Sequence, residues 1–247
     1  MNPIIDEIYR RGVVRDSTGR EYELHAHIDQ VEGKYLHGLI SSDESVTTTL
    51  EVGCEYGLSS LYICEALRNR PGVSHTIVDP YEMTAGHGVG ISNLEIAGID
   101  FFDLIMEPSE LALPKLLRER PASFDLVFID GFHTFDQTIL DLYYANRLIR
   151  VGGYIVVDDC NMASVSKAVS YYLNYPAYEH VKQIPVTPRN WKGYSAKIGR
   201  FLLVRPLAVA LPMPLYDRFY LRIRYPRMVA LRKVSDDNRD WGWFKGF

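Results

Sequence analysis

Short apolar segments alternate along this chain with stretches that have helical spacing, and this rhythm constrains the fold more than any other feature. Each apolar segment is short and continuous, as expected of strands that are buried on both faces. Strands of this kind alternating with helices predict βαβ units, and therefore a parallel sheet covered by helices. The predicted strands are residues 47–53, 75–80, 101–107, 124–130 and 152–159, and the predicted helices are residues 58–70, 93–99, 109–120, 135–149 and 164–175.

The rhythm breaks near residue 179. Residues 179–186 and 200–206 are two strand-like segments with no helix between them, which predicts an antiparallel hairpin that completes the sheet. We therefore predict an α/β, Rossmann-like fold with a seven-stranded, mostly parallel sheet, a C-terminal antiparallel hairpin and helices on both faces. The predicted core domain, residues 47–206, follows a helical N-terminal decoration (residues 1–46) and precedes a basic, aromatic extension outside the sheet (residues 207–247).

The distribution of charge bears on possible partners. A net charge of −4 over 247 residues gives no general electrostatic reason to expect nucleic-acid binding. Residues 200–247, however, contain 10 Lys and Arg against 4 Asp and Glu, a net charge of +6. Such a tail could be a lid, an arm that contacts a partner subunit, or a solvated face, and a solvated face is the default interpretation.

The cysteines and the N-terminus bear on the compartment. Cys54, Cys64 and Cys160 all lie in apolar segments, which argues against a disulfide framework and for a reducing compartment. Residues 1–11 carry charges where a secretory signal peptide needs an apolar run. No segment reaches the roughly 18 uninterrupted apolar residues of a membrane span. We therefore expect a cytoplasmic protein without stable membrane insertion.

Acidic residues lie at or near the ends of four predicted strands: Glu51, Asp79, Asp130, Asp158 and Asp159. Burying an unpaired carboxylate is costly, so packing alone does not account for this placement. One such residue could simply cap the next helix. In an open parallel sheet, however, ligands bind beyond the carboxyl ends of the strands, near the point where the strand order reverses. Five carboxylates at this edge therefore predict a binding site.

The turn after the first predicted strand contains Gly53 and Gly57. Glycine tolerates unusual backbone angles and allows a ligand to lie against the chain. The spacing is Gly-x-x-x-Gly rather than the G-x-G-x-x-G of dinucleotide-binding folds, which makes a dehydrogenase the weakest interpretation. Asp79, at the end of the second strand, is placed where an acid can accept hydrogen bonds from both hydroxyls of a ribose.

These motifs, in this order and spacing, resemble those of class I S-adenosylmethionine (SAM)-dependent methyltransferases. The resemblance covers roughly residues 47–175 and is strongest to the metal-dependent O-methyltransferases, both the catechol type and the macrocin and rhamnosyl type that act on sugars. LEVGCEYGLSSL resembles the nucleotide-binding turn, with Ser59 near the carboxylate of the methionine moiety, and PSELALPKLL resembles the segment whose serine lies beside the adenine. The cofactor-binding residues that we infer are Glu51, Gly53, Gly57, Ser59, Asp79, Ser109 and Asp130.

The same resemblance implies a metal site. In the catechol type, the aspartate that ends strand four and an Asp-Asn pair that ends strand five bind Mg²⁺, and here these positions are Asp130, Asp158 and Asp159. Three hard oxygen ligands suit a six-coordinate Mg²⁺ or another divalent cation. The general base of the catechol type is a lysine three residues after the first aspartate, whereas this chain has His133. An imidazole is well matched to removing a proton from a hydroxyl, although a lone histidine is more often structural.

We therefore expect a metal- and SAM-dependent O-methyltransferase that methylates a hydroxyl, with a sugar or sugar-bearing metabolite as acceptor and His133 as general base. Two alternatives stay open: a metal-independent N- or O-methyltransferase in which Asp158 and Asp159 cap a helix, and a non-catalytic SAM-binding scaffold. We expect a homo-oligomer and no nucleic-acid partner. His87, His25 and His27 are not expected to be ligands, and residues 189–192 could either contact a saccharide or form an exposed loop.

Overall fold

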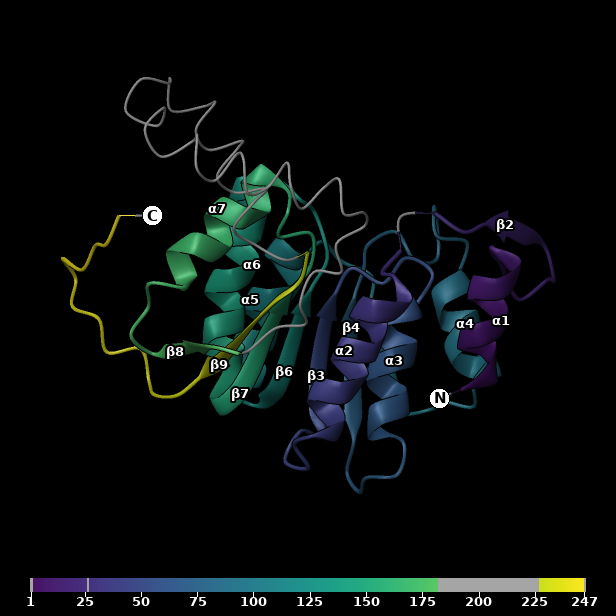
Figure 1. Ribbon diagram of the computed structural model, residues 1–247, viewed down its shortest axis with the longest axis horizontal. Helices are drawn as coiled ribbons and strands as arrows, with labels where there is room; N and C mark the ends of the chain where they lie inside the picture. Colours follow the sequence, from purple (N-terminus) through teal and green to yellow (C-terminus); the bar gives the residue numbers. More distant parts are fainter. Residues whose placement is uncertain (1, 26, 182–226, 247) are drawn as a thin grey trace, which may run out of the picture.

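The structure is a computed structural model that describes residues 2–25, 27–181 and 227–246. Within these residues, seven strands form one sheet in the order β5-β4-β3-β6-β7-β9-β8 (Figure 1). The first five in this order are parallel, β9 is antiparallel to β7, and β8 is antiparallel to β9. The strands are β3 (Thr48–Val52), β4 (Ser74–Val78), β5 (Phe102–Ile105), β6 (Phe124–Ile129), β7 (Ile149–Val157), β8 (Tyr178–His180) and β9 (Val229–Lys233).

Helices cover both faces of the sheet (Figure 1). Alternate residues of β6 point to opposite faces, so that Leu126 and Phe128 belong to one apolar core while Val127 and Ile129 belong to the other. The first core lies under α1 to α4 and the second under α5 to α7. The helices are α1 (Pro3–Arg11), α2 (Gln30–Ser41), α3 (Leu58–Leu67), α4 (Val89–Ile96), α5 (Ser109–Glu119), α6 (Phe135–Leu148) and α7 (Ala163–Tyr172).

The predicted seven-stranded Rossmann-like sheet with a C-terminal antiparallel pair is confirmed, but the position of its last strand is not. The predicted strand 200–206 lies outside the described residues, and β9 takes the antiparallel place beside β7. The prediction that no strand follows residue 206 is therefore wrong. β9 has neighbours on both sides and its residues Val229 to Leu231 are fully buried. It consequently lacks the alternation of polar and apolar residues that marks a half-buried strand.

The N-terminal region is helical, as predicted, but it also contains a short hairpin. β1 (Val13–Arg15) pairs with β2 (Glu21–Glu23) in an antiparallel manner. α2 begins with a reciprocal cap, in which the Asp29 side chain accepts from the backbone of Glu32 and Glu32 accepts from the backbone of Asp29. Glu32 is thereby held at the end of α2 that faces the carboxyl edge of the sheet.

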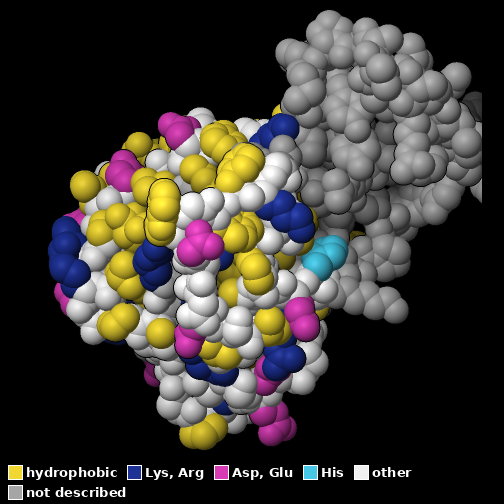
Figure 2. All heavy atoms as spheres, turned by 90° about the vertical axis from the view of Figure 1, so that its left-hand side faces the viewer, with side chains coloured by type: hydrophobic (Ala, Val, Ile, Leu, Met, Phe, Trp, Pro, Cys, Tyr) yellow, Lys and Arg dark blue, Asp and Glu magenta, His cyan; other side chains and the backbone are white. Residues whose placement is uncertain are grey.

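The segment after β9 packs on the helices of its own domain. Asn146 donates to Asp237 at 3.0 Å, and the Arg239 guanidinium lies 3.2 Å from the centre of the Tyr175 ring. The ring of Trp243 also contacts Tyr175, whereas Trp241 is fully exposed. Figure 2 shows this side of the molecule, where hydrophobic side chains are interspersed with acidic and basic ones. Within the described ranges, no helix has both the length and the apolar character needed to cross a membrane.

The strand order reverses between β3 and β6, and the backbones of the two following turns touch at that point. The chain runs from β3 outward to β4 and β5 before β6 returns to the other side of β3. Asp130 donates its backbone N–H to Val52 at 2.9 Å. Gly53 has a φ of +88°, and a Cβ at this position would collide with the carbonyl group of Asp130. Gly53 therefore allows the glycine turn and the acidic end of β6 to meet.

Gly53→Ala is expected to lower the free energy of unfolding by about 2–4 kcal/mol, because left-handed backbone strain of about 1–2 kcal/mol adds to an overpacked contact. The matched control is Gly19→Ala, since Gly19 has a φ of +85° and no neighbouring atom within 4 Å of the added Cβ. Urea denaturation of both variants separates the two contributions. Equal losses of stability would show that the contact with Asp130 is not restrictive.

Candidate active site

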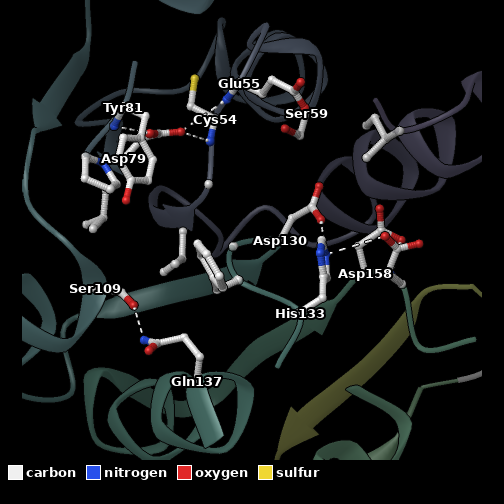
Figure 3. Close-up of a pocket in the computed structure, with 18 of the residues that line it drawn as sticks. Cys54, Glu55, Ser59, Asp79, Tyr81, Ser109, Asp130, His133, Gln137 and Asp158 are labelled. Carbon is white, nitrogen blue, oxygen red and sulfur yellow. Dashed lines mark hydrogen bonds and ion pairs between the residues drawn. The ribbon is translucent and has the colours of Figure 1, made fainter. Parts of the chain in front are cut away.

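A cavity of about 560 Å³ opens beyond the carboxyl ends of β3, β4, β6 and β7 (Figure 3). This volume is within the usual range of small-molecule sites. Most of the predicted site residues line it, and Glu51 and Gly57 do not. The predicted residues in the lining are Gly53, Ser59, Asp79, Ser109, Asp130, His133, Asp158 and Asp159.

Glu51 lies under the glycine turn rather than in the cavity. Its side chain is fully buried, accepts the hydroxyl hydrogen bond of Ser60 and lies 3.0 Å from Nε2 of His75. Nδ1 of His75 is in turn 2.9 Å from the hydroxyl of Thr49. These contacts tie β3, β4 and the first turn of α3 together. Glu51 is thus placed to support the turn from below.

Gly57 supports the same turn from another side. It precedes α3 with a φ of +70°, and a Cβ there would lie 2.8 Å from the carbonyl oxygen of Gly90 in α4. Glycine has no side chain with which to cap a helix, so the first N–H groups of α3 have no side-chain acceptor from this position. The start of α3, which includes the cavity-lining Ser59, is therefore open to an acidic group of a ligand.

Asp79 is buried and its carboxylate is largely occupied by the protein. One oxygen accepts the backbone N–H groups of Cys54 at 2.9 Å and Glu55 at 3.3 Å, and the other accepts that of Tyr81 at 2.8 Å. A carboxylate has about four acceptor positions, so Asp79 has room for roughly one more donor.

Glu55 supplies a second carboxylate in the same part of the cavity (Figure 3). It has a φ of +47°, an uncommon conformation for a residue with a side chain. Burial, together with the charges of Asp130 and Asp79, raises its pKa to about 7. A carboxylate held in this way is stabilised by donors from a ligand. Glu55 was not predicted as a site residue because no periodic pattern marks it.

At the opposite end of the cavity, His133 lies among the acidic strand ends (Figure 3). Its Nε2 is 3.3 Å from Asp130 and 3.5 Å from Asp159. Ligand atoms of these three residues all lie within 4.8 Å of one another, which is close enough for them to hold one metal ion together. The structure therefore brings together two of the three predicted metal ligands and the predicted base.

Asp158 lies deeper, next to this group. Its carboxylate accepts the backbone N–H of Asp159 at 2.7 Å and lies 4.0 Å from Nε of Arg227. The same Nε is 3.3 Å from Asp159 and 2.9 Å from Glu32. Arg227 thus joins the end of β7 to the first turn of α2. Neither Arg227 nor Glu32 was expected at the site, because each is remote from it in sequence.

Asp130, Asp158 and Asp159 form an acidic group that has too little positive charge around it. Burial and the carboxylates of Asp130 and Glu32 raise the pKa of Asp158 well above its ordinary value, and burial raises the pKa of Asp130. The hydrogen bond to Asp130 and the nearby charge of Asp159 raise the pKa of His133. Carboxylates that are buried close together in this way are relieved by a cation. The donor set, oxygens with one imidazole, fits a divalent metal ion.

Ser109 and Gln137 form a hydrogen-bonded group apart from His133 and Asp158 (Figure 3). Ser109 donates its hydroxyl to the buried Asp141 at 2.6 Å, and Gln137 donates its amide to Ser109 at 2.8 Å. Phe132 also lines the cavity and is 66% exposed, so its ring is available to a ligand. Phe132 and Gln137 were missed, although both are close in sequence to the predicted His133.

The side chains that the sequence analysis discounted lie in several environments. His87 stacks on Tyr22, with ring centres 4.7 Å apart. His25 lies 3.4 Å from Glu55, and His27 lines the cavity with a buried Nδ1 that has no hydrogen-bond partner among the described residues. Residues 189–192 lie outside the described residues.

Comparison with known proteins agrees with this site. Residues 50–160, somewhat less than half of the chain, match the family model of a methyltransferase domain. The match covers the strands from β3 to β7 and most of the cavity. Among curated proteins, no significant match was found.

Solved structures share the fold at low sequence identity. TomG, an O-methyltransferase from Streptomyces achromogenes involved in tomaymycin synthesis and solved with SAM, is 22% identical over 64% of this chain and 75% of its own, with a TM-score of 0.53. An O-methyltransferase from Bacillus cereus, in complex with SAH, is 18% identical over 73% and 83%, with a TM-score of 0.59. Cofactor-bound Rv0187 from MTB is 22% identical over 64% and 74%, with a TM-score of 0.55. These likenesses establish the fold.

Asp158→Asn is expected to stabilise the metal-free protein by about 1–3 kcal/mol at pH 7, because it removes an undercompensated buried charge and keeps the shape of the side chain. An acid whose pKa is higher in the folded state stabilises the protein at low pH, and this contribution is lost as the pH rises above the unfolded value of about 4. The wild-type free energy of unfolding should therefore fall more steeply with pH than that of the variant.

The free energy of unfolding is measured by urea denaturation in EDTA between pH 4 and pH 8. Asp103→Asn is the control, since Asp103 is an exposed acid on the edge strand β5. If Asp158→Asn is no more stable than wild type at pH 7, the negative charge of Asp158 is better compensated in the wild-type protein than its contacts indicate.

Proposed function

We propose that this chain is a SAM-dependent O-methyltransferase that uses Mg²⁺ or another divalent cation to methylate a hydroxyl group, with a sugar or sugar-bearing metabolite as acceptor. The observation that carries the proposal is the arrangement of one cavity: hydrogen-bonding groups suited to a nucleoside lie at one end, and carboxylates with an imidazole lie at the other. A methyl donor and a hydroxyl acceptor could therefore meet between them.

The donor would lie along the glycine turn. The open start of α3 and Ser59 suit the carboxylate of the methionine moiety, as in other anion sites at helix N-termini. Asp79 and Glu55 together have enough acceptor capacity for two ribose hydroxyls. Ser109 and Phe132 suit a planar base, through hydrogen bonding and stacking.

The metal ligands would be Asp130, Asp158 and Asp159. A divalent cation at this position supplies a Lewis acid that lowers the pKa of an acceptor hydroxyl. Neutralising the carboxylates would also remove the charges that raise the pKa of His133, and leave its imidazole neutral and able to accept a proton. Cation binding and base function are therefore compatible at this site.

His133 would act as general base. It accepts the proton of the acceptor hydroxyl at Nε2, the hydroxyl oxygen forms a bond to the methyl carbon, and the bond from that carbon to sulfur breaks. The other residues contribute orientation and charge, which is the usual protein contribution to a direct displacement. An alternative for His133 is direct ligation, since its Nε2 lies within the same group of ligand atoms.

One observation favours a metal-independent enzyme instead. Arg227 already places a positive charge 3.3 Å from Asp159 and 2.9 Å from Glu32, and could do part of the work of a cation.

The sugar acceptor rests on the family resemblance and on the weak acidity of alcohols, for which a metal and a base together are suited. The homo-oligomer and the cytoplasmic location stay predictions from the sequence.

His133→Ala is expected to lower kcat by about 10²–10⁴-fold, because general-base catalysis contributes a factor of this size. Affinity for S-adenosylhomocysteine should be unchanged. Turnover is measured with vicinal-diol sugars in Mg²⁺ and in EDTA, and Mg²⁺ affinity is measured by calorimetry. His180→Ala, at an exposed position of β8, is the control.

The outcomes separate the candidate roles. Loss of turnover with unchanged Mg²⁺ affinity supports the base, whereas a large loss of Mg²⁺ affinity supports ligation by His133. Full wild-type turnover in EDTA would overturn metal use and favour the role of Arg227. Full turnover in His133→Ala would overturn both roles of the imidazole.

Affinity for S-adenosylhomocysteine, measured by calorimetry in EDTA, is expected to rise by up to about tenfold between pH 6 and pH 8. The reason is that Glu55, with a pKa of about 7, accepts ribose hydroxyls only as a carboxylate. Glu55→Gln should bind more weakly at pH 8 and show little of this pH dependence. Glu44→Gln, at an exposed position, is the control. An unchanged pH profile in Glu55→Gln would exclude Glu55 as the titrating group.

A further inference from the structure

The group formed by Ser109, Gln137 and Asp141 lies at the proposed base end of the cavity and contains a buried acid that no step above uses. Asp141 is 1% exposed and does not line the cavity. One of its carboxylate oxygens accepts from Ser109 at 2.6 Å and from Gln137 at 3.3 Å. The other is buried without a hydrogen-bond partner among the described residues.

The charge of Asp141 decides the direction of these hydrogen bonds. Burial raises its pKa to about 6, so at neutral pH it is mostly ionised and can only accept. The Ser109 hydroxyl hydrogen must then point at Asp141, away from the cavity. The amide nitrogen of Gln137 is fixed in the same way, because it lies between Asp141 and a second carboxylate, Glu110, at 3.4 Å.

Two acceptors are left for a ligand. A hydroxyl oxygen has two lone pairs, and the amide of Gln137 uses one of those on Ser109. The second lone pair of Ser109 and the carbonyl oxygen of Gln137 belong to side chains that line the cavity. The subsite therefore offers acceptors and no donor from these two residues, which suits a ligand group that donates.

We propose that Asp141 is a positioning residue that fixes the hydrogen-bond polarity of Ser109 and Gln137, so that this end of the cavity selects a 6-aminopurine over a 6-oxopurine. The inference rests on the proposed SAM site. An exocyclic amine donates to both acceptors. A 6-oxo group is itself an acceptor and would face the acceptor oxygens of Ser109 and Gln137. Asp141 prevents these side chains from turning to donate, so the buried polar groups would be left unpaired.

The test compares two ligands by calorimetry: S-adenosylhomocysteine and its deaminated analogue S-inosylhomocysteine. Wild type is expected to bind the amino compound at least about 100-fold more tightly, as a site built around hydrogen bonds does. In Asp141→Asn the side chain can donate to Ser109, which frees the hydroxyl hydrogen to turn into the cavity. The preference should then fall by about tenfold or more.

Two further variants make the test specific. Asp136→Asn removes the same charge five residues earlier on α6, where Asp136 is exposed, and it should keep the wild-type preference. Ser109→Ala should lose part of the preference by itself, and adding Asp141→Asn to it should change the preference little further. Ser109→Ala also tests the inference if Asp141→Asn does not fold.

The outcomes distinguish this inference from the proposed function. A preference that is equal in wild type and Asp141→Asn, or in wild type and Ser109→Ala, overturns the inference while the SAM site stands. Wild-type protein that binds both compounds equally well also overturns it. Failure of wild type to bind S-adenosylhomocysteine at all overturns the proposed function and this inference together. A merely structural role of Asp141 would weaken both ligands alike and leave their ratio unchanged.

Discussion

The backbone contact between Gly53 and Asp130 is the constraint on which the site depends. It holds the turn after β3 against the end of β6 at the one place where the strand order reverses. A side chain on residue 53 would force the two turns apart. The proposed donor site lies along the first turn and the acidic group begins at the second, so their separation is fixed by main-chain packing. Buried contacts beneath the turn, from Glu51 to Ser60 and His75, then keep it from shifting.

Asp141 and Asp158, near the two ends of the cavity, are both buried carboxylates but have different electrostatic environments. Asp141 receives two donors and lies near one other acid, and its pKa rises only to about 6. Asp158 is equally buried but lies among other carboxylates, and its pKa rises well above the ordinary value. In the first environment, two donors from the protein hold one oxygen of Asp141, so that this side chain can serve to orient its neighbours. The second is satisfied only when positive charge is added, which is why we place the cation there and not at Asp141.

Local patterns in the sequence predicted most of the sheet and much of the site. Short apolar strands and the acids at their ends are local features, and the parallel order then brings Asp79, Asp130 and Asp158 to one edge. The misplaced last strand has a physical reason: β9 is buried between β7 and β8, so its apolar run shows no alternation that would mark it as a strand. Three backbone N–H groups from two turns converge on Asp79 only after folding. No pattern in a single sequence records that convergence.

Arg227 and Glu32 could not be predicted as site residues, because they too reach the end of β7 only after folding. Their contacts link the N-terminal region to the site. Glu32 is fixed by the cap of α2 and pairs with Arg227, which precedes β9 and also reaches Asp159. Residues from both ends of the chain therefore share one charge network with the end of β7. An arginine in this network limits repulsion among the acids while leaving the carboxylates of Asp130 and Asp159 partly exposed. Glu32, in the N-terminal helical region, thus helps to set the electrostatics of the site, because its charge and that of Arg227 both act on Asp158.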